Sequence, residues 1–170
     1  SVISYQGTSI KVPLPGKFNI SNALAAITLS KELGLSITDV KEGIESLSQI
    51  RGRVEKVDIG QNFTVIVDYA HTDDSLTKLY ETFSSSRKIA VLGSTGGGRD
   101  SWKRPVLGKI ADNYCDEIII TNEDPYDEDP MKIINDVASG VTMHTPTIIL
   151  DRREAIRQAL LLARPGDTVL

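Results

Sequence analysis

The fold of this chain is indicated by the stretch Lys88-Ile89-Ala90-Val91-Leu92-Gly93-Ser94-Thr95-Gly96-Gly97-Gly98-Arg99-Asp100. Five mostly apolar residues lead into a glycine-rich segment, and a helical pattern with a proline in its first turn begins at Arg104. A buried strand that passes through such a loop into a helix is typical of α/β proteins. Loops of this kind often place an anion at the helix N-terminus, where free N–H groups and the dipole favour negative charge. The stretch therefore predicts an α/β domain with a ligand site beyond this strand.

The alternation of strand and helix continues along the chain from Asp68 onward. The segments are strands at 88–92, 117–121, 147–150 and from Thr168, with helices at 73–83, 104–114, 129–137 and 152–162. Ile118-Ile119-Ile120 and Ile148-Ile149-Leu150 are apolar throughout, as expected of parallel strands that are covered on both faces. We therefore expect a Rossmann-like, doubly wound and mostly parallel sheet.

The residues before Arg53 follow another pattern. Short strands at 2–5 and 10–12 predict a hairpin without an obvious core of its own. Asn19 or Ser21 is expected to cap a helix that Gly34 ends. The apolar face of that helix is expected to comprise Leu24, Ala26, Ile27 and Leu33.

A second helix and a hairpin follow before the alternating region. Ser36, with Asp39 three residues later, predicts the start of the second helix. Two runs rich in β-branched residues, at 54–59 and 63–67, predict a hairpin. The change of pattern places the expected domain boundary between residues 52 and 53.

Composition excludes several classes of protein. The 170 residues are 40% hydrophobic and 25% charged, which suits a folded domain, and a net charge of -4 argues against nucleic-acid binding. No apolar run approaches the roughly 20 residues that span a bilayer, and the start of the chain lacks a basic signal region, so we expect a cytoplasmic protein without a membrane segment. The single cysteine, Cys115, is expected to be a buried thiol, and no cluster of Cys or His residues has zinc-site spacing.

The segment Asp68-Tyr69-Ala70-His71 follows a predicted strand. An acid there can accept hydrogen bonds from ribose hydroxyls, and aromatic or imidazole rings can flank a base. The alternative is structural, because an Asp before a helix is often a cap, although Thr72 or Asp73 with Ser75 would serve as well.

The glycine loop is neither a dinucleotide fingerprint nor a Walker A loop. Arg99, Lys103 and Arg104 favour an anion-binding role, since arginine holds carboxylates and phosphates through paired hydrogen bonds. The alternative is a flexible turn without a ligand.

An acidic, proline-containing loop, Asn122 to Pro130, follows the next strand. Asp129 is expected to cap the next helix at Pro130, and Asp127 and Glu128 are interpreted as solvated. Asp124 and Tyr126 lie nearest the strand end, where a wall of a ligand pocket is expected.

Several of these segments, taken in order, resemble the Mur ligase family. They are the string from Leu14-Pro15-Gly16-Lys17 to Ala26, Gly52-Arg53-Val54-Glu55, Asp68-Tyr69-Ala70-His71-Thr72, and Gly97-Gly98-Arg99-Asp100 with Lys103-Arg104-Pro105. The resemblance implies that residues 1–52 end a central ATP-binding domain and that residues 53–170 form the C-terminal domain, truncated at its end. It also implies a ligase that uses ATP and Mg²⁺ to add the third amino acid to UDP-N-acetylmuramoyl-L-Ala-D-Glu during peptidoglycan precursor synthesis.

The resemblance also implies roles for individual residues. Those near the nucleotide would be Asn19, Asn22, Arg53, Asp68, Tyr69 and His71. Those near the incoming amino acid would be Arg99, Asp100, Lys103, Glu123, Asp124, Pro125 and Tyr126. The magnesium ligands and the catalytic machinery would lie before Ser1, so the isolated chain is expected to be inactive without the N-terminal and central domains.

The loop Glu123-Asp124-Pro125-Tyr126 replaces the Asp-Asn-Pro-Arg of family members that add meso-diaminopimelate. Without that arginine, Coulomb complementarity favours a distal ammonium over a distal carboxylate, which predicts lysine or ornithine as the substrate. Two other functions stay open: a nucleotide- or ligand-binding module without ligase activity, and another amide ligase such as a folylpolyglutamate or cyanophycin synthetase.

Overall fold

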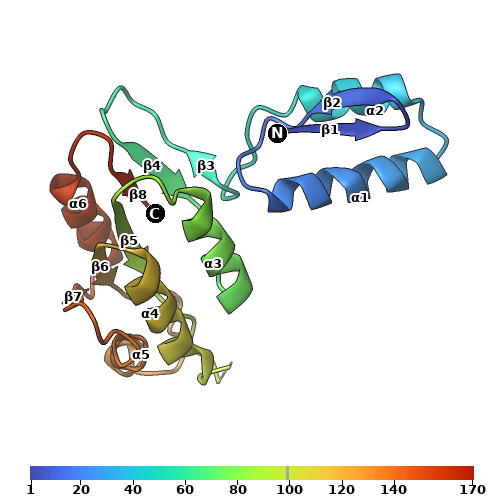
Figure 1. The fold of residues 1–170 in the computed structure, drawn as a ribbon. Helices are drawn as coiled ribbons and strands as arrows, with labels where there is room; N and C mark the ends of the chain where they lie inside the picture. The colour runs from blue at the N-terminus through green and yellow to red at the C-terminus, as the bar shows by residue number, and fades with distance from the viewer. Residues whose placement is uncertain (99) are drawn as a thin grey trace. The chain divides into compact units, whose positions relative to one another are not determined.

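The computed structural model describes residues 1–98 and 100–170. The chain divides into two compact units, Ser1–Glu55 and Lys56–Leu170, and Figure 1 shows the secondary structure of each. Across these described ranges, no helix is both long and apolar enough to cross a bilayer.

The first unit begins with a hairpin of β1 (Val2–Tyr5) and β2 (Thr8–Lys11), whose strands pair antiparallel. Gln6 and Gly7 both have positive φ, 49° and 79°, as a tight two-residue hairpin turn requires. The hairpin shares its core with helices α1 (Phe18–Glu32) and α2 (Ile37–Glu45). The buried residues of this core are Ile3, Ile10, Val12, Ala23, Ile27, Val40 and Ile44.

Helix α1 differs from the prediction at its start and in its buried face. Its N-cap is Lys17, without a side-chain cap, and Asn19 lies in the first turn with its Nδ2 donating to the Pro15 carbonyl at 2.6 Å. Neither Asn19 nor Ser21 is the cap. The buried residues are Asn19, Ala23 and Ile27, whereas Leu24 and Leu33 are 38% and 72% exposed. The apolar residues of this helix lie on all of its sides, so their spacing in the sequence did not identify the buried face.

Helix α2 begins as predicted. The Ser36 hydroxyl accepts the Asp39 amide at 3.1 Å and donates to the Asp39 carboxylate at 2.6 Å. This cap satisfies one of the free N–H groups that every helix start carries. The prediction of a helix that starts at Ser36 is confirmed.

The second unit contains a sheet of six strands in the order β3-β4-β8-β5-β6-β7. The strands are β3 (Glu55–Lys56), β4 (Thr64–Val67), β5 (Lys88–Leu92), β6 (Glu117–Ile120), β7 (Thr147–Ile148) and β8 (Thr168–Val169). All the pairs from β4 across to β7 are parallel. The last strand of the chain therefore lies in the middle of the sheet.

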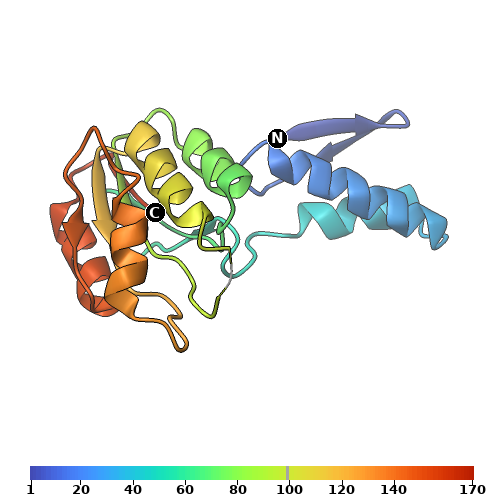
Figure 2. The same ribbon diagram turned by 90° about the horizontal axis from the view of Figure 1, so that it is seen from below.

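Helices cover both faces of this sheet (Figures 1 and 2). One face packs against α6 (Arg152–Leu162), with Ile89, Ile119 and Val169 of the sheet contacting Ala155 and Ala159. The other face carries α3 (Asp73–Thr82), α4 (Lys103–Tyr114) and α5 (Pro130–Ala138), and Figure 2 shows α3 and α4 side by side. The predicted α/β class, with a doubly wound and mostly parallel sheet, is confirmed.

Two predicted strands are shorter in the structure. In the hairpin predicted at 54–59 and 63–67, β3 is two residues long, because the side chains of Asp58 and Gln61 hydrogen-bond to the backbone of residues 57–60 and form a turn. At the sheet edge, β7 is also two residues long. Ile148 is 42% exposed, so the expectation of cover on both faces is wrong for this strand.

A group of ion pairs and hydrogen bonds connects the strands of the sheet at their amino ends. Arg87 forms ion pairs of 2.7 Å with both Asp167 and Glu117, and the Ser86 and Thr168 hydroxyls are 2.7 Å apart. These contacts fix β8 between its neighbours. Cys115 is buried as predicted, and burial raises the pKa of its thiol to about 12.

Candidate functional site

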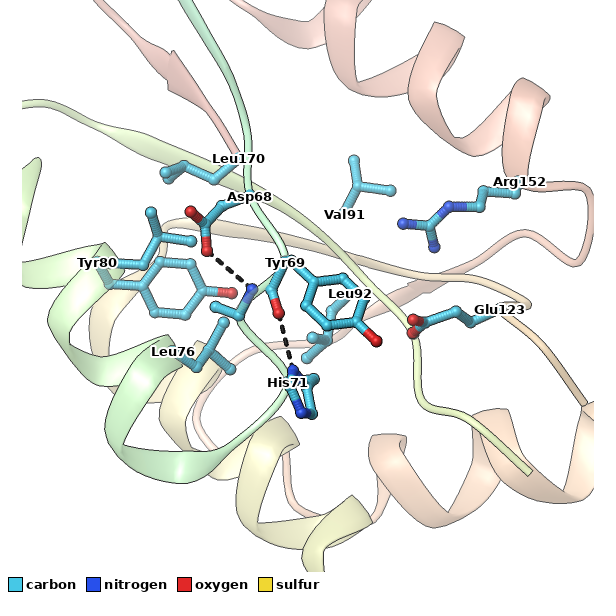
Figure 3. Close-up of a pocket in the computed structure, with 13 residues that line it drawn as sticks. Asp68, Tyr69, His71, Leu76, Tyr80, Val91, Leu92, Glu123, Arg152 and Leu170 are labelled. Atoms are coloured by element: carbon cyan, nitrogen blue, oxygen red, sulfur yellow. Dashed lines mark hydrogen bonds between the residues drawn. The ribbon is translucent and has the colours of Figure 1, made fainter. Parts of the chain in front are cut away.

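A cavity of about 160 Å³ lies within the second unit at the carboxyl ends of β4, β5 and β6 (Figure 3). Open α/β sheets bind ligands at this edge, because the loops that leave neighbouring strands converge there. The polar side chains that line the cavity are Asp68, Tyr69, His71, Tyr80, Glu123 and Arg152. Four of these, all except Tyr80 and Arg152, are residues that the sequence predicted for the site.

The segment after β4 is held by its own side chains. The Asp68 Oδ1 accepts the Ala70 amide at 2.8 Å, and the His71 Nδ1 lies 2.9 Å from the Tyr69 carbonyl oxygen (Figure 3). The Tyr69 and His71 rings are 4.8 Å apart at a tilt of 52°. Thr72 caps α3 in a reciprocal capping box with Ser75. The alternative role of Asp68 as the helix cap is therefore wrong.

Glu123 reaches the same cavity from the end of β6. Its side chain lies over Gly93, where an added Cβ would be 3.0 Å from the Glu123 Cβ and 3.2 Å from its Oε2. The glycine at the end of β5 thus leaves the space that the Glu123 side chain occupies. Figure 3 shows the Glu123 carboxylate pointing toward the Tyr69 ring.

Sequence analysis missed Arg152, which is the first residue of α6 and lines the cavity. Its Nη1 donates to the Asn122 carbonyl at 3.3 Å. A cation in the first turn of a helix opposes the helix dipole. That feature, directly after a predicted strand end, is the sequence signal that could have identified it.

The glycine loop packs against the acidic loop rather than presenting its amides to a ligand. The Gly96 amide donates to the Asp124 carbonyl at 2.8 Å, and the Gly98 amide donates to Glu128 Oε1 at 2.9 Å. A Cβ on Gly96 would lie 2.1 Å from the Pro125 carbonyl oxygen. The predicted anion-binding role is therefore wrong for these two amides, and the glycines permit close packing of two loops.

Arg104 and Glu128 also differ from their predicted roles. Arg104 is 1% exposed, and its guanidinium forms ion pairs with Glu128 at 2.9 Å and Asp136 at 3.0 Å. Burial alone would lower the pKa of Arg104, but the hydrogen bonds to these two carboxylates outweigh it and raise the pKa. The Arg104 guanidinium is thus already paired with two carboxylates of the protein. The interpretation of Glu128 as a solvated residue is wrong, because its carboxylate forms one of these ion pairs.

Other predicted substrate residues lie at the glycine and acidic loops. The Asp100 carbonyl accepts the Lys103 amide at 3.0 Å, at the start of α4. The Tyr126 ring packs beside Gly97, and its backbone has a positive φ of 53°. Tyr126 is 68% exposed, so its ring is accessible. Arg99 lies outside the described residues.

The predicted nucleotide residues Asn19, Asn22 and Arg53 belong to the first unit. The two asparagines line an apolar cavity of about 210 Å³ and are joined by a hydrogen bond of 3.1 Å from Asn22 Nδ2 to Asn19 Oδ1. Because Asn19 is 8% exposed and donates to Pro15, its amide supports the turn before α1. The Arg53 amide donates to the Ile50 carbonyl at 3.1 Å in the turn at Gly52.

The residues at the carboxyl edge of the sheet suit one part of a nucleotide better than another. The acid and rings at the carboxyl edge suit a ribose and a base, but the Gly96 and Gly98 amides are already bonded within the protein. Within residues 1–98 and 100–170, no group of three or more His, Cys, Asp or Glu side chains could hold a metal ion. The described residues thus fit the nucleoside part of ATP and supply no magnesium cluster.

Comparison with known proteins identifies several similar chains. A family model described as "Mur ligase, glutamate ligase domain" matches residues 52–170. A curated relative from Syntrophomonas wolfei, a "UDP-N-acetylmuramoyl-L-alanyl-D-glutamate--2,6-diaminopimelate ligase", is 44% identical over 95% of the chain. The chain spans about a third of the length of such relatives, 34% in each of two.

Solved structures show the same likeness. The structure of a ligase of that name has a TM-score of 0.66 and 31% identity, and the match covers 99% of this chain and 36% of the other. A folylpolyglutamate synthase from Mycobacterium tuberculosis has a TM-score of 0.75 at 20% identity, covering 94% of this chain and 38% of the other. At that identity the second match shows a shared fold alone.

Proposed function

The chain belongs to the Mur ligase family. We propose that it is a C-terminal part of an ATP-dependent ligase that adds the third amino acid to a UDP-muramoyl dipeptide. The proposal is carried by the cavity at the carboxyl edge of the sheet, which gathers Asp68, Tyr69, His71 and Glu123. Residues 53–170 would be the C-terminal domain, and residues 1–52 the end of the central ATP-binding domain. The ligase would act in the cytoplasm.

In this proposal the cavity lies where nucleotide and amino acid meet. When bound, ATP and Mg²⁺ supply the activation of the dipeptide carboxylate as an acyl phosphate. Asp68 and the Tyr69 and His71 rings would contact the nucleoside, whereas Glu123, Asp124 and Tyr126 would contact the incoming amino acid. Asn19, Asn22 and Arg53 would also bind the nucleotide, and the other domains of the protein would provide the phosphate loop and metal ligands.

The acidic loop supports lysine or ornithine as the added amino acid. Glu123 and Asp124 place acids where a distal ammonium would be favoured, and Tyr126 carries no positive charge that could hold a distal carboxylate. A second candidate, meso-diaminopimelate, is favoured by the names of the curated relatives. Lysine and meso-diaminopimelate differ only in a carboxylate on the distal carbon.

The experiment is an assay of the full-length protein with ATP and UDP-N-acetylmuramoyl-L-Ala-D-Glu. Lysine, ornithine and meso-diaminopimelate are supplied separately, and both phosphate release and product mass are measured. We expect a tripeptide product with at least one of these amino acids and a larger kcat/KM for lysine or ornithine. A larger kcat/KM for meso-diaminopimelate would overturn the proposed substrate.

The same assay addresses the other functions. Nucleotide binding without any amide product from the full-length protein would favour a binding module. Amide formation on a folate substrate instead of the muramoyl dipeptide would favour another amide ligase, a role for which the similar folylpolyglutamate synthase fold gives no residue-level support. The isolated chain is expected to release no phosphate above background.

A further inference from the structure

Arg152 and Glu123, two side chains of opposite charge, line the same cavity, and no ion pair joins them. Arg152 donates to a backbone carbonyl, and the described part of the chain places no carboxylate within 4 Å of its guanidinium. Glu123 likewise has no cation within 4 Å and no hydrogen bond to its carboxylate among the residues described. Figure 3 shows both charged groups directed toward the part of the cavity beside the Tyr69 ring.

The acids around α6 do not compensate Arg152. The Asp151 carboxylate accepts the Glu154 amide at 2.8 Å as the helix cap, and Glu154 pairs with Arg157 at 3.0 Å. The helix dipole at this end also disfavours a cation. A bound carboxylate would be held by the Arg152 guanidinium and by the positive end of the helix together.

The cavity has space for a small charged group. Its volume of about 160 Å³ is well above the roughly 10–15 Å³ that a cavity needs to hold one water molecule. A group that carries an ammonium and a carboxylate on one carbon would complement both walls. Such a group is the zwitterionic head of a free amino acid.

We propose that Arg152 binds the carboxylate, and Glu123 the ammonium, of an amino-acid head group. The inference rests on the proposed ligase function and adds a binding residue to it. This head group has two possible sources. It is either the α end of lysine or ornithine, in which case Asp124 is the acid left to face the distal ammonium, or the distal end of meso-diaminopimelate. In the second case Arg152 would supply the positive charge that Tyr126 cannot.

The test compares Arg152→Gln with Arg153→Gln in the full-length ligase. Arg153 is the matched control, because it is an exposed arginine in the same helical turn and does not line the cavity. We expect Arg152→Gln to raise the KM for the amino acid at least tenfold with the KM for ATP unchanged, and Arg153→Gln to change neither. Arg152→Lys should recover part of the loss, because it keeps the charge but not the paired geometry.

The choice of substrate separates the two sources. A rise in KM confined to meso-diaminopimelate would place the distal head group on Arg152, and a rise shared with lysine would place the α end there. Either result supports the proposal. An unchanged amino-acid KM, or a rise confined to ATP, would overturn it. Failure of the wild-type protein to form any amide product would contradict the ligase function instead.

Discussion

Arg104 of α4 donates through Nη2 to both carboxylate oxygens of Glu128, at 3.0 Å to Oε1 and 2.9 Å to Oε2. The same Oε1 accepts the Gly98 amide. One carboxylate from the acidic loop thus fixes both the glycine loop and the helix that follows it. The two loops that the sequence presents as separate motifs form one structure.

Replacement of Glu128 by Gln should destabilise the protein. The buried Arg104 charge would keep only Asp136 as a carboxylate partner, and an incompletely compensated buried charge is costly. We expect a lower urea midpoint for Glu128→Gln and faster hydrogen exchange at the Gly98 amide. Asp127→Asn is the control, since Asp127 is exposed in the same loop. Equal midpoints for the two variants would refute this role of Glu128.

Replacement of Gly96 by Ala should also destabilise the protein. The added Cβ would lie 2.1 Å from the Pro125 carbonyl oxygen, and this backbone atom cannot rotate aside as a flexible side chain could. We expect a loss of about 1–3 kcal/mol in the free energy of unfolding, as for other overpacked sites.

Gly43→Ala is the matched control for Gly96→Ala. It lies in α2, where an added Cβ meets nothing within 4 Å, so the substitution should raise the free energy of unfolding by about 0.5–1 kcal/mol. Urea unfolding of both variants measures the contrast. A neutral Gly96→Ala would show that the two loops can separate at little cost.

Asp112 should make the stability depend on pH in the acid range. Burial alone would raise its pKa, but hydrogen bonds from the Met143 and Thr142 amides and from His144 outweigh burial and hold the pKa below the usual range. The folded pKa is therefore below the unfolded value of about 3.9. The stabilisation is fully present above about pH 4–5 and is lost as pH falls toward the folded pKa.

The measurement for Asp112 is urea unfolding of the wild type and Asp112→Asn between neutral pH and pH 2. Glu128 and Asp167 also have lowered pKa values, so the wild type should lose stability steeply and the variant less steeply. Identical slopes would show that Asp112 does not contribute. The comparison of slopes is independent of any uniform loss of stability in the variant.

Much of the second unit was predictable because its signals are local. The β5 bounds of Lys88–Leu92 and the α6 bounds of Arg152–Leu162 agree with the prediction, since hydrophobic periodicity and caps act over a few residues. In the first unit, the Ser36 cap followed from the same reasoning. The buried face of α1 could not be predicted in this way, because the apolar side chains of Leu24 and Leu33 are exposed in the structure.

The carboxyl-edge cavity was partly predictable for a similar reason. Asp68 was assigned from its place after a strand and Glu123 from the family resemblance, and parallel strands bring such strand ends together. Arg152 was not assigned, because a single arginine at the start of a helix is usually a solvated surface residue. The fold of the sheet is what brings it to the same cavity as Glu123.

The class of fold, the order of its elements and the likeness to the Mur ligase family were all predictable before the fold was known, because each depends on short segments and their order. In contrast, the charged and polar groups that are already bonded within the protein became evident only from the packing of the folded chain. Gly98 and Glu128 are 30 residues apart, and Arg104 and Asp136 are 32 apart. Partners at such separations are set by how helices pack on the sheet, so an amide or an arginine that looks available in the sequence can be fully bonded in the fold.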